Sequence, residues 1–131
     1  MTGASFGLDR IGQILVPITD VDRAVEFYRD RLGMSFLFRF PGMAFFDCGG
    51  IRLYLAVPES RSFRGRATIY YRVVDIDAAV EALVARGVTF DDRPHVVHRD
   101  EQQELWMAFF RDPDGNNLAL MAEIGVAAKV A

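Results

Sequence analysis

The chain repeats itself, and an internal repeat limits the possible folds more than any other feature of a sequence. The segment Asp20-Val-Asp-Arg-Ala-Val-Glu26 returns 55 residues later as Asp75-Ile-Asp-Ala-Ala-Val-Glu81. Further along, Met43-Ala-Phe-Phe46 returns as Met107-Ala-Phe-Phe110. We therefore predict two copies of one folding unit, residues 10–58 and 66–123, with a polar, basic linker at 59–65 and a tail at 124–131. Residues 1–131 together are expected to form one domain.

Each copy has the pattern of a β-α-β-β-β unit. In the first copy an apolar run over residues 11–18 predicts a strand, and apolar positions at helical spacing then predict a helix that begins after Asp20 and stops at Gly33. Strands are expected over 35–40, 43–47 and 51–57. In the second copy we expect a strand over 67–74, a helix over 76–85, and strands over 89–97, 105–110 and 117–123. The predicted fold is α+β, with helices outside and curved mixed sheets around a central cavity.

Charge and composition exclude several classes of partner. Fifteen Lys and Arg against eighteen Asp and Glu give a net charge of −3, which argues against nucleic acid and anionic membranes. No apolar run approaches the roughly 18 residues that cross a bilayer, and residues 1–10 lack the pattern of a signal peptide. The single Cys48 cannot form an internal disulfide. We expect a cytoplasmic protein with a small-molecule partner.

Strand alternation predicts which side chains line the cavity, because successive residues of a strand point to opposite faces. On one face it groups hydrogen-bonding side chains, namely Gln13, Tyr54, Thr68 and Tyr70. Arg52 and Arg72 share that face and could bind a carboxylate or phosphate near the mouth of the cavity. The other interpretation is that the tyrosines fill a dry core and both arginines are solvated at strand ends. The opposite face is apolar and is expected beneath the helices: Ile14, Val16, Ile18, Leu53, Ile69, Val73, Leu118 and Leu120.

Three further features are candidates for a site. Trp106 follows a polar run, so we predict that it forms a pocket wall or a subunit contact. His95 and His98 are three residues apart, a spacing that on a strand points them to opposite faces, and we interpret them as a surface pair. His98 could still act as an acid or base if its segment covers the cavity. Cys48 has no histidine within ten residues, which argues against a catalytic nucleophile.

Two segments carry a family resemblance: Asp20-Val-Asp-Arg-Ala-Val-Glu-Phe-Tyr-Arg-Asp-Arg-Leu-Gly33 and Phe109-Phe-Arg-Asp-Pro-Asp-Gly-Asn116. They resemble the vicinal oxygen chelate superfamily, which includes glyoxalase I, bleomycin-resistance proteins and extradiol dioxygenases. The resemblance implies His or Glu metal ligands on the first and last strand of each unit. The corresponding positions here are Gln13, Tyr54, Thr68 and Ala119. Because none of these is His, Asp or Glu, we predict that the metal site is lost and that no cofactor is bound.

The resemblance leaves three functions open. The leading hypothesis is a metal-free protein of the bleomycin-resistance type that binds an apolar or aromatic small molecule in the cavity, with Ala119 and Trp106 among its lining residues. The second is an enzyme, a lyase, isomerase or dioxygenase similar to glyoxalase I. The third is a regulatory or assembly subunit with a vestigial cavity. The resemblance also implies a homodimer.

Overall fold

The computed structural model describes residues 6–60 and 63–125. The first half contains β1 (Gln13–Pro17), α1 (Val21–Val25), a π-helix η1 (Glu26–Arg31), β2 (Ser35–Phe40), β3 (Met43–Cys48) and β4 (Ile51–Ala56). The second half contains β5 (Thr68–Arg72), α2 (Ile76–Ala85), β6 (His95–Arg99), β7 (Gln103–Arg111) and β8 (Asn117–Gly125). The predicted linker 59–65 and tail 124–131 lie partly outside the described residues.

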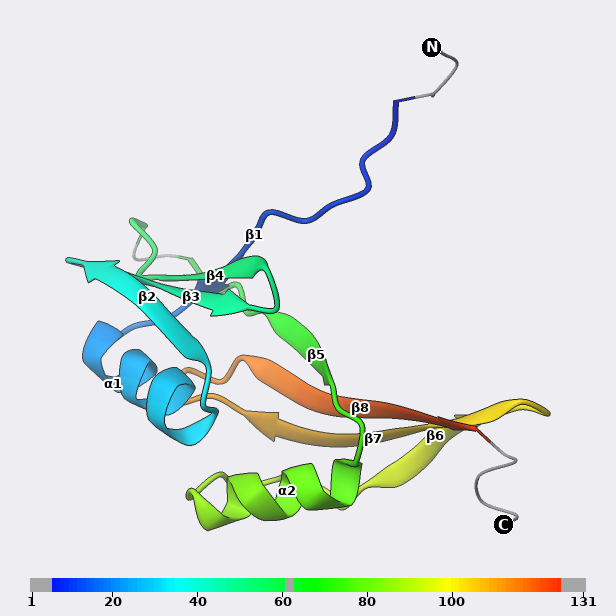
Figure 1. Cartoon of the computed structure of the whole chain (residues 1–131). Coiled ribbons are helices and arrows are strands. Elements are labelled where there is room, and N and C mark those ends of the chain that lie inside the picture. Colours follow the sequence, from blue (N-terminus) through cyan, green and yellow to red (C-terminus); the bar gives the residue numbers. More distant parts are fainter. Residues whose placement is uncertain (1–5, 61–62, 126–131) are drawn as a thin grey trace.

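The two halves form two sheets of the same topology. Their strand orders are β1-β4-β3-β2 and β5-β8-β7-β6. In each sheet the first strand runs parallel to the last, and the other neighbours are antiparallel. The α+β fold with two mixed sheets is thus confirmed, and Figure 1 shows that the sheets remain separate and do not close into a barrel.

Aspartates begin both helical segments, and glycines follow their ends. The Asp20 carboxylate accepts a hydrogen bond from the Arg23 amide at 3.1 Å, and Asp75 accepts one from the Ala78 amide at 3.0 Å. Gly33 and Gly87 have φ of 72° and 91°, a backbone conformation that favours glycine. The helix predicted in the first unit differs in one respect: it widens into the π-helix η1 from Glu26 onward.

One predicted strand is shorter than expected. The sequence predicts a strand over residues 89–97, but β6 spans His95–Arg99, and Phe90 forms an isolated bridge with Phe110. Pro94 immediately precedes the strand and has no amide hydrogen to donate, so the sheet ladder cannot run continuously through it.

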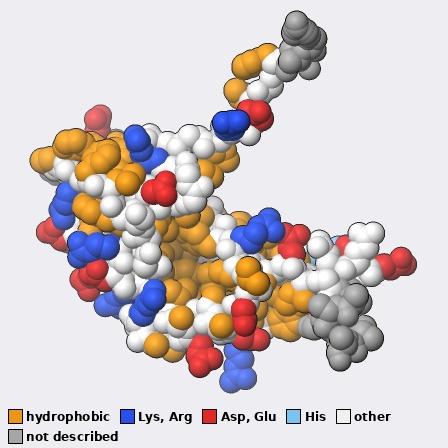
Figure 2. Space-filling view, in the orientation of Figure 1, with side chains coloured by type: hydrophobic (Ala, Val, Ile, Leu, Met, Phe, Trp, Pro, Cys, Tyr) orange, Lys and Arg blue, Asp and Glu red, His pale blue; other side chains and the backbone are white. Residues whose placement is uncertain are grey.

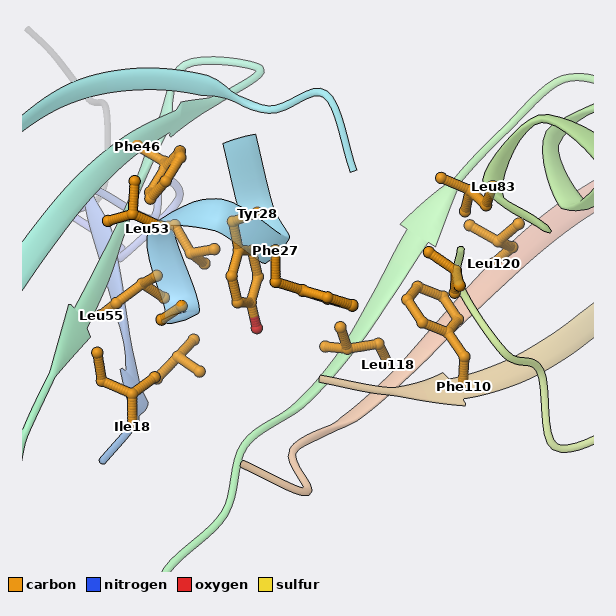
Figure 3. Packing of buried hydrophobic residues seen from close by; sticks show 14 of the residues in the cluster. Ile18, Phe27, Tyr28, Phe46, Leu53, Leu55, Leu83, Phe110, Leu118 and Leu120 are labelled. Atoms are coloured by element: carbon orange, nitrogen blue, oxygen red, sulfur yellow. The ribbon is translucent and has the colours of Figure 1, made fainter. Parts of the chain in front are cut away.

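The helix-covered faces of the two sheets merge in one hydrophobic core. The apolar set predicted beneath the helices is confirmed: Val16, Ile18, Leu53, Leu118 and Leu120 are buried, and Ile14, Ile69 and Val73 pack against the core. Figure 3 shows Phe27 of η1 reaching toward Leu118 of the second sheet, with Tyr28 beside it. No helix among the described residues is long and apolar enough to span a membrane.

A buried polar network joins the two units at the turn between β7 and β8. The Tyr28 hydroxyl donates to Oδ2 of Asp112 at 2.8 Å, although the two residues are 84 apart in the chain. The side-chain nitrogen of Asn116 donates to the same oxygen and to the Pro17 carbonyl, both at 2.8 Å. Because Asp112 and Asn116 are buried, these hydrogen bonds fix the turn of the second unit against the first strand. The sequence predicted only a turn here.

Candidate functional site

The face of the first sheet that is turned away from its helix carries a row of aromatic side chains. The strand register places Leu15, Tyr54, Phe45 and Phe38 side by side across β1, β4, β3 and β2. The Phe45 and Tyr54 rings are stacked with centroids 4.7 Å apart, and the Phe38 ring lies 4.8 Å from that of Phe45. A bulge after Phe36 turns Phe38 onto this side. We call this surface the first open face; it comprises Gln13, Leu15, Phe38, Phe40, Phe45, Arg52 and Tyr54.

Arg52 places a positive charge on the first open face. Its guanidinium carbon lies 5.9 Å from the Phe38 ring centroid and 5.7 Å from that of Phe45. The side chain is exposed, and no carboxylate of the described residues forms an ion pair with it. Gln13 stands directly beside it in the register of β1 and β4. The face therefore combines a row of packed aromatic rings, a positively charged guanidinium and a side-chain amide.

The second sheet has an equivalent surface, which we call the second open face; it comprises Thr68, Tyr70, Arg72, Phe109, Asn117, Ala119 and Met121. Ala119 stands between Tyr70 and Phe109 in the register and is fully buried under larger neighbours. The Tyr70 and Phe109 rings meet edge to face with centroids 6.3 Å apart. Arg72 differs from Arg52 because it forms an ion pair with Glu123. That hydrogen bond from Arg72 lowers the pKa of the Glu123 carboxyl.

Seven of the eight predicted site residues lie on the two open faces. Gln13, Arg52 and Tyr54 are on the first, and Thr68, Tyr70, Arg72 and Ala119 are on the second. The ring contacts of each face stay within its own sheet. Leu15 and Tyr70 remain 50% and 49% exposed. One chain therefore presents these residues on two solvent-exposed surfaces and does not bring them together around a closed cavity.

Trp106 lies on the other side of the second sheet. It is paired with Ala122 and packs against the hydrophobic core, on the same side as Ala108 and Phe110. Its indole nitrogen donates to Glu104 at 3.1 Å. Trp106 therefore does not line the second open face, because alternation along β7 gives that side to Phe109.

The two histidines do not follow simple alternation. A bulge between Val96 and His98 places His95 opposite Met107 and His98 opposite Leu105, two residues on the same side of β7. The prediction that the pair points to opposite faces is therefore wrong. Both side chains are exposed, and each lies near an aspartate: His95 is 3.6 Å from Asp92 and His98 is 3.4 Å from Asp100.

The open faces do not fit a divalent metal ion. The positions that correspond to family ligands offer an amide from Gln13, a phenol from Tyr54, a hydroxyl from Thr68 and a methyl group from Ala119. Such a set has neither the negative charge nor the imidazole nitrogen that holds a transition metal. Within residues 6–60 and 63–125, no group of three or more His, Cys, Asp or Glu side chains could hold a metal ion.

Comparison with known proteins identifies the family. The model of the Glyoxalase/Bleomycin resistance protein/Dioxygenase superfamily matches residues 10–120. The chain belongs to this superfamily. It is 30% identical over 122 residues to the uncharacterized protein YraH of Bacillus subtilis (strain 168), a match that covers 79% of this chain and 91% of YraH.

Solved structures of the superfamily share the fold. Lactoylglutathione lyase from Agrobacterium tumefaciens superposes with a TM-score of 0.75 at 21% identity, covering 88% of this chain and 95% of the lyase. A glyoxalase/bleomycin resistance protein/dioxygenase from Nocardioides superposes with a TM-score of 0.68 at 26% identity, covering 92% of this chain and 87% of that protein. At identities this low the proteins share an architecture, and a shared architecture does not by itself determine the function.

Proposed function

We propose that the chain is a small-molecule-binding protein of this superfamily that holds a flat apolar or aromatic ligand on its open faces without a metal ion. The observation that carries the proposal is the exposed aromatic surface. On the first open face, Leu15, Phe38 and Phe40 are 50%, 39% and 55% exposed. Contiguous exposed apolar surface of this kind marks a binding site.

The polar groups of the first open face favour an aromatic anion as ligand. Arg52 lies beside the rings of Phe38 and Phe45, so its guanidinium can meet a carboxylate while the outer edges of those rings contact the ligand. Gln13 and Tyr54 add hydrogen-bonding groups on neighbouring strands. Arg72 contributes less, because Glu123 already neutralises its charge.

We propose further that a homodimer completes the site, with the first open face of one protomer opposite the second open face of its partner. Each face alone covers a ligand from one side, and ligand pockets enclose most of a ligand's surface. Pairing would also remove Leu15 and Tyr70 from water. A cytoplasmic location remains part of the proposal.

The binding proposal is tested by calorimetric titration with 2-naphthoate, a flat aromatic anion. We expect Phe38→Ala and Arg52→Gln each to weaken binding about tenfold, since each removes about 1.4 kcal/mol of aromatic contact or charge-assisted hydrogen bonding. Leu37→Ala is the control: Leu37 neighbours Phe38, is similarly exposed at 43%, and is the bulge residue with no partner in the register. An equal loss in Leu37→Ala and Phe38→Ala, or no saturable binding at all, would overturn the proposal.

The metal-free part is tested separately by elemental mass spectrometry after incubation with Zn²⁺, Ni²⁺, Mn²⁺ and Fe²⁺. We expect no ion to remain in stoichiometric amount after desalting. About one ion per chain would show that the ligand positions were aligned wrongly and would place metal chemistry first.

Enzymatic activity is the second candidate, and the bulge in β6 favours it. It brings His95 and His98 to one side of the second sheet, the side of Met107. An imidazole side chain can donate or accept a proton, so either histidine can act as an acid or base. Turnover of a hemithioacetal that is lost in His98→Gln, while 2-naphthoate affinity is unchanged, would favour the enzyme over the binding protein.

A further inference from the structure

A cavity lies on the helix side of the molecule, away from both open faces. It has a volume of about 570 Å³ and separates the end of η1 and the start of β2 from β5 and α2. Figure 2 shows it as a hollow lined by hydrophobic side chains between the two halves of the molecule. Its lining includes Met34, Cys48, Tyr71, Leu83 and Phe110. We call it the helix-side cleft.

One residue of the lining, Tyr71, carries a hydroxyl group without a partner among the described residues. Tyr71 follows Tyr70 on β5, so alternation turns it toward the helix side, where its ring packs against the core. Its hydroxyl oxygen is buried and, among the described residues, no group forms a hydrogen bond with it. Burial raises the pKa of Tyr71, and the nearby Cys48 and Asp112 add to this, so the hydroxyl stays protonated. It is a donor from which no group of the described residues accepts a hydrogen bond.

The charges around the helix-side cleft favour a neutral ligand. Of the described residues that line it, Asp47 is the one ionised side chain, and it lies at the exposed rim. Burial raises the pKa of the Cys48 thiol, which keeps it uncharged as well. A carboxylate or phosphate would find no lysine or arginine in the described lining and would face a like charge at the rim.

We propose that the helix-side cleft is a second binding site, which takes a neutral apolar molecule carrying one carbonyl or hydroxyl oxygen that accepts a hydrogen bond from Tyr71. The volume is within the range of small-molecule pockets, roughly 300–1,000 Å³. A ligand oxygen would satisfy the donor, whose burial without a partner costs about 1–3 kcal/mol. This site is independent of the one proposed above, because it lies on the opposite side of each sheet and prefers a neutral ligand.

Cys48 reports on the cleft, because it lines the cavity and is the single cysteine of the chain. The probes are 2-acetylnaphthalene, which carries a carbonyl, and 2-ethylnaphthalene, which has nearly the same shape without it. We expect 2-acetylnaphthalene to slow the reaction of Cys48 with dithiobis(nitrobenzoate) saturably, and to bind about tenfold more tightly than 2-ethylnaphthalene. In Tyr71→Phe the two probes should bind within about twofold of each other. Equal affinities of the two probes in the unaltered protein would overturn the proposal.

A pair of variants on α2 tests the location. Ala82 is exposed and lines the cleft, so Ala82→Phe should fill it and abolish protection of Cys48. Ala85 is exposed on the same helix but outside the lining, so Ala85→Phe should keep protection unchanged. Protection that survives in Ala82→Phe contradicts the proposal. So does protection that rises with protein concentration without any probe, because a second copy would then cover the cleft. Saturating 2-naphthoate should leave the affinity for 2-acetylnaphthalene unchanged, which separates failure of this proposal from failure of the first.

Discussion

Tyr28→Phe removes one hydroxyl group from the junction between the two units. That hydroxyl donates to Asp112 at 2.8 Å, and both residues are buried. Burial and the neighbouring negative charge of Asp112 raise the pKa of Tyr28 well above its usual value, so the group is a proton donor throughout the neutral range. The substitution therefore deletes a charge-assisted hydrogen bond without introducing new atoms.

The size of the effect follows from what remains at Asp112. Its carboxylate still accepts hydrogen bonds from the Asp114 amide and the Asn116 amide at 2.9 Å, and from the Asn116 side chain at 2.8 Å. The cost is thus the lost hydrogen bond to a charged acceptor, about 2 kcal/mol, and does not include an unpaired charge. For a chain of this length we expect the melting temperature to fall by about 6–10 °C.

Tyr71→Phe is the matched control, because it removes the same atom from a buried hydroxyl that has no partner among the described residues. We expect its free energy of unfolding to stay unchanged or to rise. Both variants are measured by urea unfolding at pH 7, followed by circular dichroism. If Tyr28→Phe loses less than about 0.5 kcal/mol, or if Tyr71→Phe loses as much as Tyr28→Phe, the assignment of the junction is refuted.

Three further predictions concern stability and reactivity. Asn116→Ala should lower the free energy of unfolding by more than Tyr28→Phe, because the Asn116 side chain makes three hydrogen bonds: two buried ones, to Asp112 and Pro17, and a partly buried one with Ala67. Urea midpoints compare the two variants, and an equal or smaller loss in Asn116→Ala speaks against the network. Arg72 lowers the folded pKa of Glu123 below its unfolded value of about 4.3, so the stabilisation from the Glu123 carboxylate is complete above the unfolded pKa and is lost as the pH falls through the folded pKa. Glu123→Gln should remove this part of the acid dependence of the urea midpoint. An unchanged pH profile in the variant would contradict the prediction. Because the pKa of Cys48 is raised, its reaction with dithiobis(nitrobenzoate) at pH 8 should be slower in the folded chain than in urea, and equal rates would refute the burial argument.

Much of the fold could be predicted because the repeat and the alternation of apolar residues act locally. The helix predicted over residues 76–85 is observed as α2 (Ile76–Ala85), and the apolar set under the helices is buried or packed against the core. Those features depend on the spacing of apolar residues along the chain, which is visible in the sequence. Alternation also assigned Gln13, Arg52 and Tyr54 correctly to one face.

The sequence pattern does not predict features that depend on a single inserted residue or on contacts between the two units. The bulges in β2 and β6 shift the register by one residue, which turned Phe38 onto the open side and brought His95 and His98 to the same side. Asp112 was visible only as part of a turn, because its partner Tyr28 belongs to the other unit. The helix-side cleft likewise arises from packing between units.

The most direct test of where the ligand binds is a titration of the isotope-labelled protein with 2-naphthoate, followed by amide chemical shifts. The two open faces predict the largest shifts at Gln13 and Arg52 in the first sheet, and at Thr68 and Tyr70 in the second. Binding of one ligand per chain would agree with sites completed by a partner protomer, because each chain has two open faces and each site would use two. Shifts confined to α2 and the β3–β4 turn would place the ligand in the helix-side cleft and would contradict the proposal that the open faces form the binding site.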